Sequence, residues 1–279
     1  MSNPLRSWFW LNASTGPRFS SLDPGLIGTE DIMRILLVNP NTTADLTDLM
    51  LEAGLRGAGP DTELVAMTAP RGVPYVATQA EAQIAGAVVL EMIADAAGNA
   101  DAALVAAFGD PGLLGARELF PFPVVGMAEA AMLTACMEGR RFGIVTFSTA
   151  LAPWYRDTVR LYGLEERCAG VFALKGSFSS ISDVQAEKEE LLVGLAGEAV
   201  EAGADVLIFA GAPLSGLAAR IADRLPVPAV EQVAAAVRQA ETLVLLRGGR
   251  RGAPTGRVPK PTKGLSPALA AHLESDAPG

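Results

Sequence analysis

The sequence predicts an α/β protein made of two related units, each with its own parallel sheet. Two observations lead to this prediction. From Met33 onward, short runs of aliphatic and β-branched residues alternate with longer stretches rich in Ala, Leu and Glu. This alternation is typical of parallel strands whose two faces are covered by helices. The second half of the chain also repeats the order and spacing of the first half.

Each element follows from its local pattern, taken in order along the chain. A strand is predicted where a short apolar run ends in polar, glycine or proline residues, and a helix where a longer apolar-periodic stretch follows a capping residue. The predicted strands cover 34–39, 64–68, 102–108, 124–125, 141–146, 167–174, 205–209 and 227–230. The predicted helices cover about 42–57, 78–98, 112–119, 128–138, 149–163, 183–203, 214–224 and 231–246.

The internal repeat places particular residues at equivalent strand ends. Residues 34–42 resemble 141–149, and 101–107 resemble 205–211. In both halves the second of these segments leads after a similar interval to a Pro-Val pair, at Pro123 and Pro226. Three matches in the same order favour two related α/β units over coincidence.

The repeat also predicts where a ligand binds. In open α/β sheets the ligand lies outside the carboxyl ends of the strands. Asn39, Ala107, Thr146 and Gly211 each stand at such an end. We therefore expect these four residues to surround one active-site cleft between the two units.

The domain organisation follows from composition and from the repeat. Residues 1–32 are rich in Ser, Pro, Gly and Asn, and we expect a loose N-terminal extension there. The first unit is expected at 33–130, completed by about 228–246, and the second unit at 131–227. Residues 247–279 form a tail with several Arg and Lys residues among Gly and Pro, which indicates a flexible or clamping segment.

Composition excludes several classes of protein. The net charge of −9 argues against a nucleic-acid or anionic-membrane partner. The single histidine, His272, excludes a His-based triad or a His-cluster metal site. The two cysteines, Cys136 and Cys168, are too few for a disulfide scaffold and fit a reducing cytoplasm. We expect no membrane span, because the longest charge-free run is far shorter than the roughly 20 residues a spanning helix needs.

Polar residues at the strand ends are candidate ligand-binding groups. Asn39, Asn41 and Thr42 open the first helix, and Thr146, Phe147 and Ser148 occupy the matching place in the second unit. Free backbone N–H groups at a helix start favour an anion. Simple helix capping explains either motif alone, whereas the recurrence favours binding of a small carboxylate or imide.

The turn after the third predicted strand supplies one carboxylate. Residues 107–112 read Ala-Phe-Gly-Asp-Pro-Gly, a tight turn that brings backbone amides and Asp110 toward the cleft. Asp110 is either an acid/base or orienting group, or an Asx-turn or helix cap. Glu129 and Glu231 follow strands in the two units, where each either orients substrate or caps a helix.

The motifs between Met33 and about Leu246 resemble the aspartate/glutamate and hydantoin racemase superfamily. They include R-I-L-L-V-N-P-N-T-T, A-F-G-D-P-G-L, P-V-V-G-M-A-E-A-A and D-V-L-I-F-A-G-A-P-L-S-G-L, and the tail K-P-T-K-G-L-S-P-A-L resembles hydantoin and allantoin racemases. The resemblance implies two flavodoxin-like units related by a pseudo-twofold axis, with the substrate between them. It also implies a cofactor-independent, metal-free enzyme that is commonly oligomeric.

The resemblance further implies two catalytic cysteines, one on each face of the substrate carbon, for general acid/base proton transfer. These positions fall on Ala107 and Gly211 in this chain, and neither residue can exchange a proton. Three explanations fit: an engineered replacement of a natural cysteine by Ala107, a natural enzyme that uses other groups such as Asp110, Thr146, Ser148 or Glu129, and a non-catalytic binder of small anions.

The sequence therefore predicts a cytoplasmic racemase-family enzyme that acts at the carbon α to a carbonyl of a small carboxylate or cyclic imide or ureide. Decarboxylation, another lyase reaction and ring opening are the alternative reactions. The predicted partners are a small-molecule substrate and, in keeping with the family, further copies of the chain. The residues predicted to bind substrate are Asn39, Asn41, Thr42, Phe108, Gly109, Thr146, Phe147, Ser148 and Ala212, and those predicted at catalytic positions are Ala107, Gly211 and Asp110.

Overall fold

The computed structural model describes residues 32–248 and 258–275. These residues belong to one compact unit that begins at Ile32. The predicted N-terminal extension lies outside the described residues except for Ile32, and so do residues 249–257 and 276–279 of the predicted tail. The following description concerns this unit alone.

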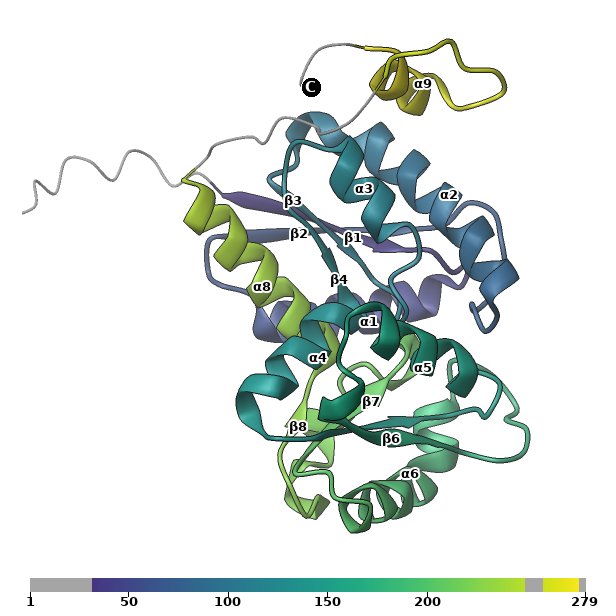
Figure 1. Ribbon diagram of the computed structural model, residues 1–279, viewed down its shortest axis with the longest axis vertical. Helices are drawn as coiled ribbons and strands as arrows, with labels where there is room; N and C mark the ends of the chain where they lie inside the picture. Colours follow the sequence, from purple (N-terminus) through teal and green to yellow (C-terminus); the bar gives the residue numbers. More distant parts are fainter. Residues whose placement is uncertain (1–31, 249–257, 276–279) are drawn as a thin grey trace, which may run out of the picture. The chain divides into compact units, whose positions relative to one another are not determined.

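Two four-stranded parallel sheets form the framework of the unit (Figure 1). The first has the strand order β2-β1-β3-β4 and the second the order β6-β5-β7-β8. The orders are equivalent, because the strand that begins each half lies second in its sheet. The prediction of an α/β fold with two related units of parallel strands is confirmed.

The strands are short and mostly apolar, as the sequence pattern predicts. Those of the first sheet are β1 (Met33–Asn39), β2 (Thr62–Thr68), β3 (Ala102–Val105) and β4 (Val124–Gly126). Those of the second sheet are β5 (Phe142–Thr146), β6 (Cys168–Ala173), β7 (Val206–Ala210) and β8 (Ala229–Val230).

Helices connect successive strands and cover the sheets. The α-helices are α1 (Ala44–Gly57), α2 (Gln79–Ala96), α3 (Leu113–Leu119), α4 (Met127–Glu138), α5 (Ala152–Leu161), α6 (Val184–Glu201), α7 (Leu217–Arg220), α8 (Gln232–Arg247) and α9 (Pro267–Glu274). Short 3₁₀ turns occupy Ala97–Asn99, Glu165–Arg167, Ala212–Leu214 and Ala222–Arg224.

The central strands are buried on both faces, which explains their continuous apolar runs. All residues of β3, β5 and β7 are buried. Helix α8 follows the last strand of the second sheet and returns to the first unit, where it contacts α1, β3 and β4. It also contacts α4.

Several boundaries differ from the predicted ones for local reasons. Strand β3 ends at Val105 and not at Phe108, because the chain turns where the Asp110 N–H donates to the Ala107 carbonyl at 3.0 Å. The predicted helix over 214–224 is reduced to one turn, α7, which follows Gly216 at φ +79°. Strand β8 is short because Pro226 and Pro228 have no N–H to donate to a neighbouring strand.

The helix α9 was not predicted from the sequence. Ser266 caps its first turn by accepting a hydrogen bond from the Leu269 N–H, and Pro267 occupies the first turn. Leu269 is buried against the core of the first unit, where α9 contacts α2. Among the described helices, none is both long enough and apolar enough to cross a membrane.

Candidate functional site

A small cavity lies where the carboxyl ends of β3 and β7 lead into their turns. Its volume is about 20 Å³, which is room for about one water molecule. The residues that line it come from both units and are mainly aromatic or aliphatic: Asn41, Leu46, Tyr75, Val76, Ala107, Phe108, Phe147, Leu151, Trp154, Tyr155, Gly211, Ala212 and Pro213. The structure thus brings Ala107 and Gly211 to one cavity.

Aromatic rings close this cavity. Tyr75, Phe147 and Phe178 form a cluster of edge-to-face pairs, with ring centroids 5.7 to 6.4 Å apart. Phe108 packs against Tyr155 with a centroid distance of 4.9 Å. Tyr75 and Phe178 stand in the loops that follow β2 and β6, whereas Phe147 directly follows β5 and Phe108 lies in the turn after β3. Rings from both sheets therefore border the cavity.

The turn after β3 presents the Ala107 methyl group to the cavity. Gly109 has φ +133°, and a Cβ there would collide with the indole of Trp154. The glycine therefore allows Trp154, from α5 of the second unit, to pack directly on the turn of the first unit. Gly109 itself does not line the cavity.

The equivalent turn after β7 is fixed by Gln232. The Gly211 N–H donates to Gln232 Oε1 at 3.0 Å, and Gln232 Nε2 donates to the Gly211 carbonyl at 2.7 Å. Gly211 has φ +110°. A Cβ at this residue would stand 2.9 Å from Cε1 of Phe147 and 3.1 Å from Oη of Tyr155. Aromatic groups thus occupy the space into which a side chain at position 211 would project.

Two backbone N–H groups are available beside these positions. Phe108 follows Ala107, Ala212 follows Gly211, and both line the cavity. Neither N–H has an acceptor within the described parts of the chain. Unpaired N–H groups at strand ends can hold a carboxylate or an enolate oxygen.

The polar residues after β1 mostly form hydrogen bonds with other residues of the chain. Asn39 Nδ2 donates to Thr47 Oγ1 at 2.8 Å, and Asn39 Oδ1 accepts from the N–H and side-chain amide of Asn41. The Thr42 N–H, which we expected to be free for an anion, donates instead to the Val73 carbonyl. Asn41 lines the cavity, whereas Asn39 and Thr42 do not.

In the matching segment of the second unit, some of the predicted residues line the cavity and others are hydrogen-bonded inside the fold. Thr146 is fully buried, and its hydroxyl donates to the Ala210 carbonyl at 3.0 Å. The Ser148 hydroxyl accepts from the Ala150 N–H in the turn that leads to α5. Phe147 and Ala212 line the cavity, and Thr146 and Ser148 do not.

Asp110 points away from the cavity into a buried hydrogen-bond network. Its carboxylate accepts from the N–H groups of Ala128 and Glu129 at the start of α4, and from the Tyr162 hydroxyl at 2.7 Å. It therefore caps α4, not α3, which directly follows it in sequence. Burial raises the pKa of Asp110 to about 7, although the three donors act in the opposite direction.

Glu129 and Glu231 also have structural partners. Glu129 pairs with Arg117 in a two-pronged ion pair. Glu231 accepts from the N–H groups of Ala234 and Gly216, so it caps α8. Neither carboxylate lines the cavity described above.

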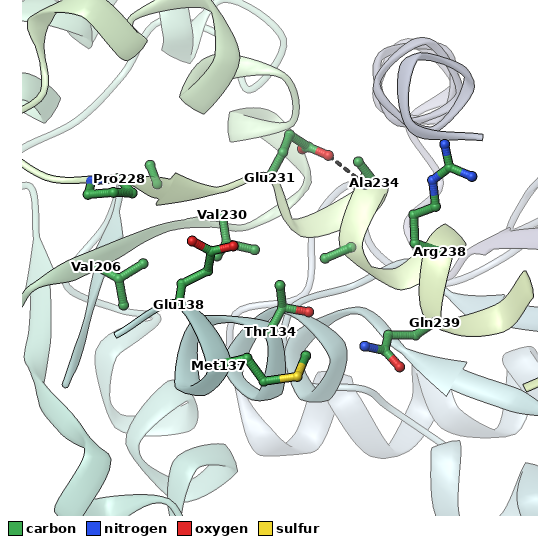
Figure 2. A pocket seen from close by; sticks show the side chains of 12 residues that line it. Thr134, Met137, Glu138, Val206, Pro228, Val230, Glu231, Ala234, Arg238 and Gln239 are labelled. Carbon is green, nitrogen blue, oxygen red and sulfur yellow. Dashed lines mark hydrogen bonds between the residues drawn. The ribbon is translucent and has the colours of Figure 1, made fainter. Parts of the chain in front are cut away.

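A larger hollow of about 380 Å³ lies elsewhere, between α4, β8 and α8 (Figure 2). Figure 2 shows at its edge the capping bond that the Ala234 N–H donates to Glu231, with Arg238 farther along α8. Arg238 is paired with Glu241. This hollow contains none of the strand-end residues that the repeat identifies, so we place the site at the smaller cavity.

The two cysteines lie outside the cavity, in α4 and β6. Burial raises the pKa of both Cys136 and Cys168, which keeps them as neutral thiols. No cluster of three His, Cys, Asp or Glu that could hold a metal ion occurs among the residues described.

Sequence reasoning missed Tyr75, Trp154, Tyr155 and Gln232. Tyr75 comes from a loop with no motif of its own. Trp154 and Tyr155 follow Pro153 in the first turn of α5. This aromatic pair, shortly after a predicted strand end, was the only sequence signal for them. Gln232 acts on the backbone of Gly211, which is distant in sequence.

Comparison with known proteins gives the class to which this fold and cavity belong. A family model described as Asp/Glu/Hydantoin racemase matches residues 35–240. The chain belongs to this family, and the prediction of a racemase-family enzyme is confirmed at that level.

Individual relatives are similar over most of their length. A hydantoin racemase of Paenarthrobacter aurescens is 31% identical over 234 residues, covering 83% of this chain and 98% of the relative. A hydantoin racemase of Rhizobium meliloti is 33% identical over 76% of this chain and 89% of its own. The solved structure of an allantoin racemase from Klebsiella pneumoniae has a TM-score of 0.79 at 32% identity, over 85% of this chain and 98% of that one.

Proposed function

We propose that the protein is an enzyme that acts at the carbon α to a carbonyl of a small cyclic ureide or a related carboxylate. The observation that carries this proposal is the meeting of Ala107, Phe108, Gly211 and Ala212 in one cavity. Hydantoin and allantoin, named for the relatives, are both cyclic ureides with such a carbon. The N–H groups of Phe108 and Ala212 would hold the oxygen of the enolate.

The residues at positions 107 and 211 decide which reaction the chain can perform. Racemisation by proton transfer needs a group that removes the proton on one face and a group that returns a proton on the other. Ala107 presents only a methyl group, and Gly211 has no side chain. This chain therefore cannot racemise a substrate with thiols at positions 107 and 211. The cavity that these two positions line is nevertheless present.

The test separates binding from proton transfer. We expect 5-methylhydantoin or allantoin to bind the unaltered protein, as measured by saturation-transfer NMR. We expect the Ala107→Cys variant to exchange the substrate α-proton for deuterium in D₂O, because the thiolate supplies a base inside the cavity. The matched Ala107→Ser variant, similar in size but without a thiol, should show no exchange.

Failure would be plain in either measurement. If neither the unaltered protein nor Ala107→Cys binds hydantoins, allantoin or aspartate, the proposed substrate class is wrong. If Ala107→Cys binds them and exchanges no proton, the placement of the reacting carbon beside position 107 is wrong.

A non-catalytic binder of the same compounds is a second candidate, favoured by the loss of both proton-transfer positions. It predicts tight binding by the unaltered protein with no turnover of any compound in this class.

Our proposal also includes a cytoplasmic location. It includes no nucleic-acid partner, in keeping with the net charge of −9. It further includes a homo-oligomer, which size-exclusion chromatography would detect.

A further inference from the structure

A hollow lined by three arginines lies at the opposite end of the second sheet from the strand-end cavity. Its volume is about 660 Å³, and Arg140, Arg141 and Arg167 line it. Arg141 directly precedes β5, whereas Phe147, which lines the cavity, directly follows β5. A strand rises about 3.3 Å per residue, so these two residues lie roughly 20 Å apart along it. The hollow is therefore separate from the cavity.

The three guanidinium groups of this hollow differ from most others in the chain because no carboxylate pairs with them. Ion pairs hold arginines throughout the fold, from Arg34 in β1 to Arg238 in α8. Arg140, Arg141 and Arg167 form no ion pair with a carboxylate of the described residues. Three such cations in one hollow, in a chain with a net charge of −9, point to an anion that comes from outside the chain.

Main-chain carbonyls hold two of these side chains in place. Arg167 Nε donates to the Arg140 carbonyl at 2.6 Å, and its Nη2 donates to two carbonyls at the end of α4, at 2.7 Å each. Arg141 Nη2 donates to the Cys168 carbonyl at 3.3 Å. The remaining guanidinium N–H groups of both residues have no acceptor within the described ranges. Their positions are set in advance, and donors remain for a ligand.

Two carboxylates also line the hollow and restrict what it can bind. Asp205 accepts from the backbone N–H groups of Arg140 and Arg141 at 3.0 and 2.9 Å, so the main chain partly balances its charge. Glu166 is exposed, and its charge opposes the binding of an anion. A long polyanion would meet these carboxylates and the negative charge of the whole chain. A small anion with its charges close together is favoured instead.

A diphosphate group fits this set of donors. A planar guanidinium can donate two parallel N–H bonds to a phosphate, and such charge-assisted bonds are about twice as strong as neutral ones. One carboxylate has too few oxygens to use three guanidinium groups, whereas two linked phosphates have enough. The volume of about 660 Å³ lies within the roughly 300–1,000 Å³ of most small-molecule sites.

We propose that Arg140, Arg141 and Arg167 form a second binding site, which takes a diphosphate group, either free or carried by a small molecule such as a nucleotide. The site lies where β5 and β7 begin, and it is independent of the proposed function. It gives the protein a way to bind an anionic ligand while the strand-end cavity is occupied.

The first experiment measures binding by isothermal titration calorimetry, with the full-length protein at low salt and without divalent cations. We expect inorganic pyrophosphate and ADP to bind at one site per chain, and inorganic phosphate to bind more weakly because it reaches fewer guanidinium groups. The affinity should fall as salt is added, since the charges are partly exposed. Equal affinities for pyrophosphate and ADP would show that only the diphosphate is recognised. Tighter binding of ADP would show that the hollow also contacts the nucleoside.

Variants assign the binding to the hollow. Arg140→Gln and Arg141→Gln should each weaken pyrophosphate binding at least about 10-fold, because each removes charge-assisted bonds. Glu166→Gln should strengthen it several-fold. Arg71→Gln is the matched control, because Arg71 is paired with Glu91 in the first unit, and it should not change the affinity. The Arg140 side chain forms no hydrogen bond within the described chain, so urea unfolding of Arg140→Gln should match that of the unaltered protein.

The outcomes separate this site from the cavity. The inference is wrong if neither pyrophosphate nor ADP binds the unaltered protein, or if Arg140→Gln and Arg141→Gln bind them as tightly as Arg71→Gln does. Pyrophosphate should bind equally well in the presence of saturating 5-methylhydantoin, and competition between the two would place the anion in the cavity and overturn the inference. Failure of 5-methylhydantoin to bind would count against the proposed function alone.

Discussion

At the scale of single residues, the conformation of Gly211 determines which groups can act in the cavity. Its φ of +110° is one that residues with a Cβ rarely adopt. Phe147 and Tyr155 fill the space in which a side chain would lie. The two facts together make glycine a structural requirement at this position, whereas Ala107 is not among the residues with positive φ.

We expect Gly211→Ala to lower the free energy of unfolding by about 1–3 kcal/mol, because the backbone strain and the contact with Phe147 add together. Urea unfolding measures this loss. Gly163→Ala is the matched control, because Gly163 also has positive φ, at +67°, but has open space around it. Equal losses in the two variants would show that the rings yield freely and do not restrict position 211.

The pH dependence of stability should report on Asp110. Burial raises its pKa from 3.8 to about 7, so the folded state favours the neutral carboxyl. Its stabilising contribution is then complete below about pH 4 and is lost as the pH rises through 7. We expect the free energy of unfolding of the unaltered protein to fall relative to Asp110→Asn between pH 4 and pH 8, by up to about 4 kcal/mol.

Asp205 gives the opposite sign and serves as the comparison. The N–H groups of Arg140 and Arg141 donate to its carboxylate and lower its pKa. The unaltered protein should therefore lose stability relative to Asp205→Asn only as the pH falls below about 4. The unaltered protein could instead gain stability relative to Asp110→Asn as the pH rises, as we expect for the Asp205 comparison. That result would show that the hydrogen-bond donors around Asp110 outweigh the effect of its burial on the pKa.

At the scale of elements, the glycines of helix α6 and the glycine of strand β5 have different surroundings. Gly194 and Gly197 lie within α6, and a Cβ at either position would meet no other atom within 4 Å. Gly143 in β5 is crowded instead, since a Cβ there would lie 2.9 Å from the Cβ of Ala199 in the same helix. One face of α6 therefore packs closely on β5 while another has room.

We expect Gly194→Ala to raise the free energy of unfolding by about 0.5–1 kcal/mol, because alanine loses less conformational freedom in a helix. Gly143→Ala should lower it, since the sheet and helix would have to separate. Thermal or urea unfolding of the two variants checks both signs. A loss of stability in Gly194→Ala would indicate that this face of α6 is covered.

The sequence was sufficient for elements whose pattern is local. Continuous apolar runs identified β1, β3, β5 and β7, and the repeat predicted that their ends meet. It was insufficient where a boundary depends on distant partners. Strand β3 stops early because of the turn through Asp110, whose carboxylate is held by α4, and α9 forms because Leu269 finds a pocket on the first unit. The phenol of Tyr155 could not be placed, since its position beside Phe108 and Gly211 depends on contacts between residues far apart in the sequence.

At the scale of the whole unit, the aromatic cluster of Tyr75, Phe147 and Phe178 lies at the cavity, which two of its three rings line. Its rings come from loops after strands of both sheets. A volume of about 20 Å³ excludes a ureide until these rings separate. We therefore expect binding to include a movement of the loops that carry Tyr75 and Phe178.

We expect Phe178→Ala to increase the rate of ligand association several-fold, because one ring of the closure is removed. The change should cost about 1 kcal/mol of stability through the lost ring contacts. Stopped-flow fluorescence of Trp154, which lines the cavity, can follow binding of 5-methylhydantoin. Leu191→Ala, at an exposed position of α6, is the control and should not change the rate. An unchanged rate in Phe178→Ala would place the entrance elsewhere.

The filled space at Gly211 also has a consequence for redesign of the cavity. Placing a side chain at position 211 would require the backbone to leave its positive φ and the rings of Phe147 and Tyr155 to shift. Position 107 already carries a Cβ, so a change there keeps the backbone as it is. The two equivalent strand ends therefore differ in how easily a new functional group can be introduced.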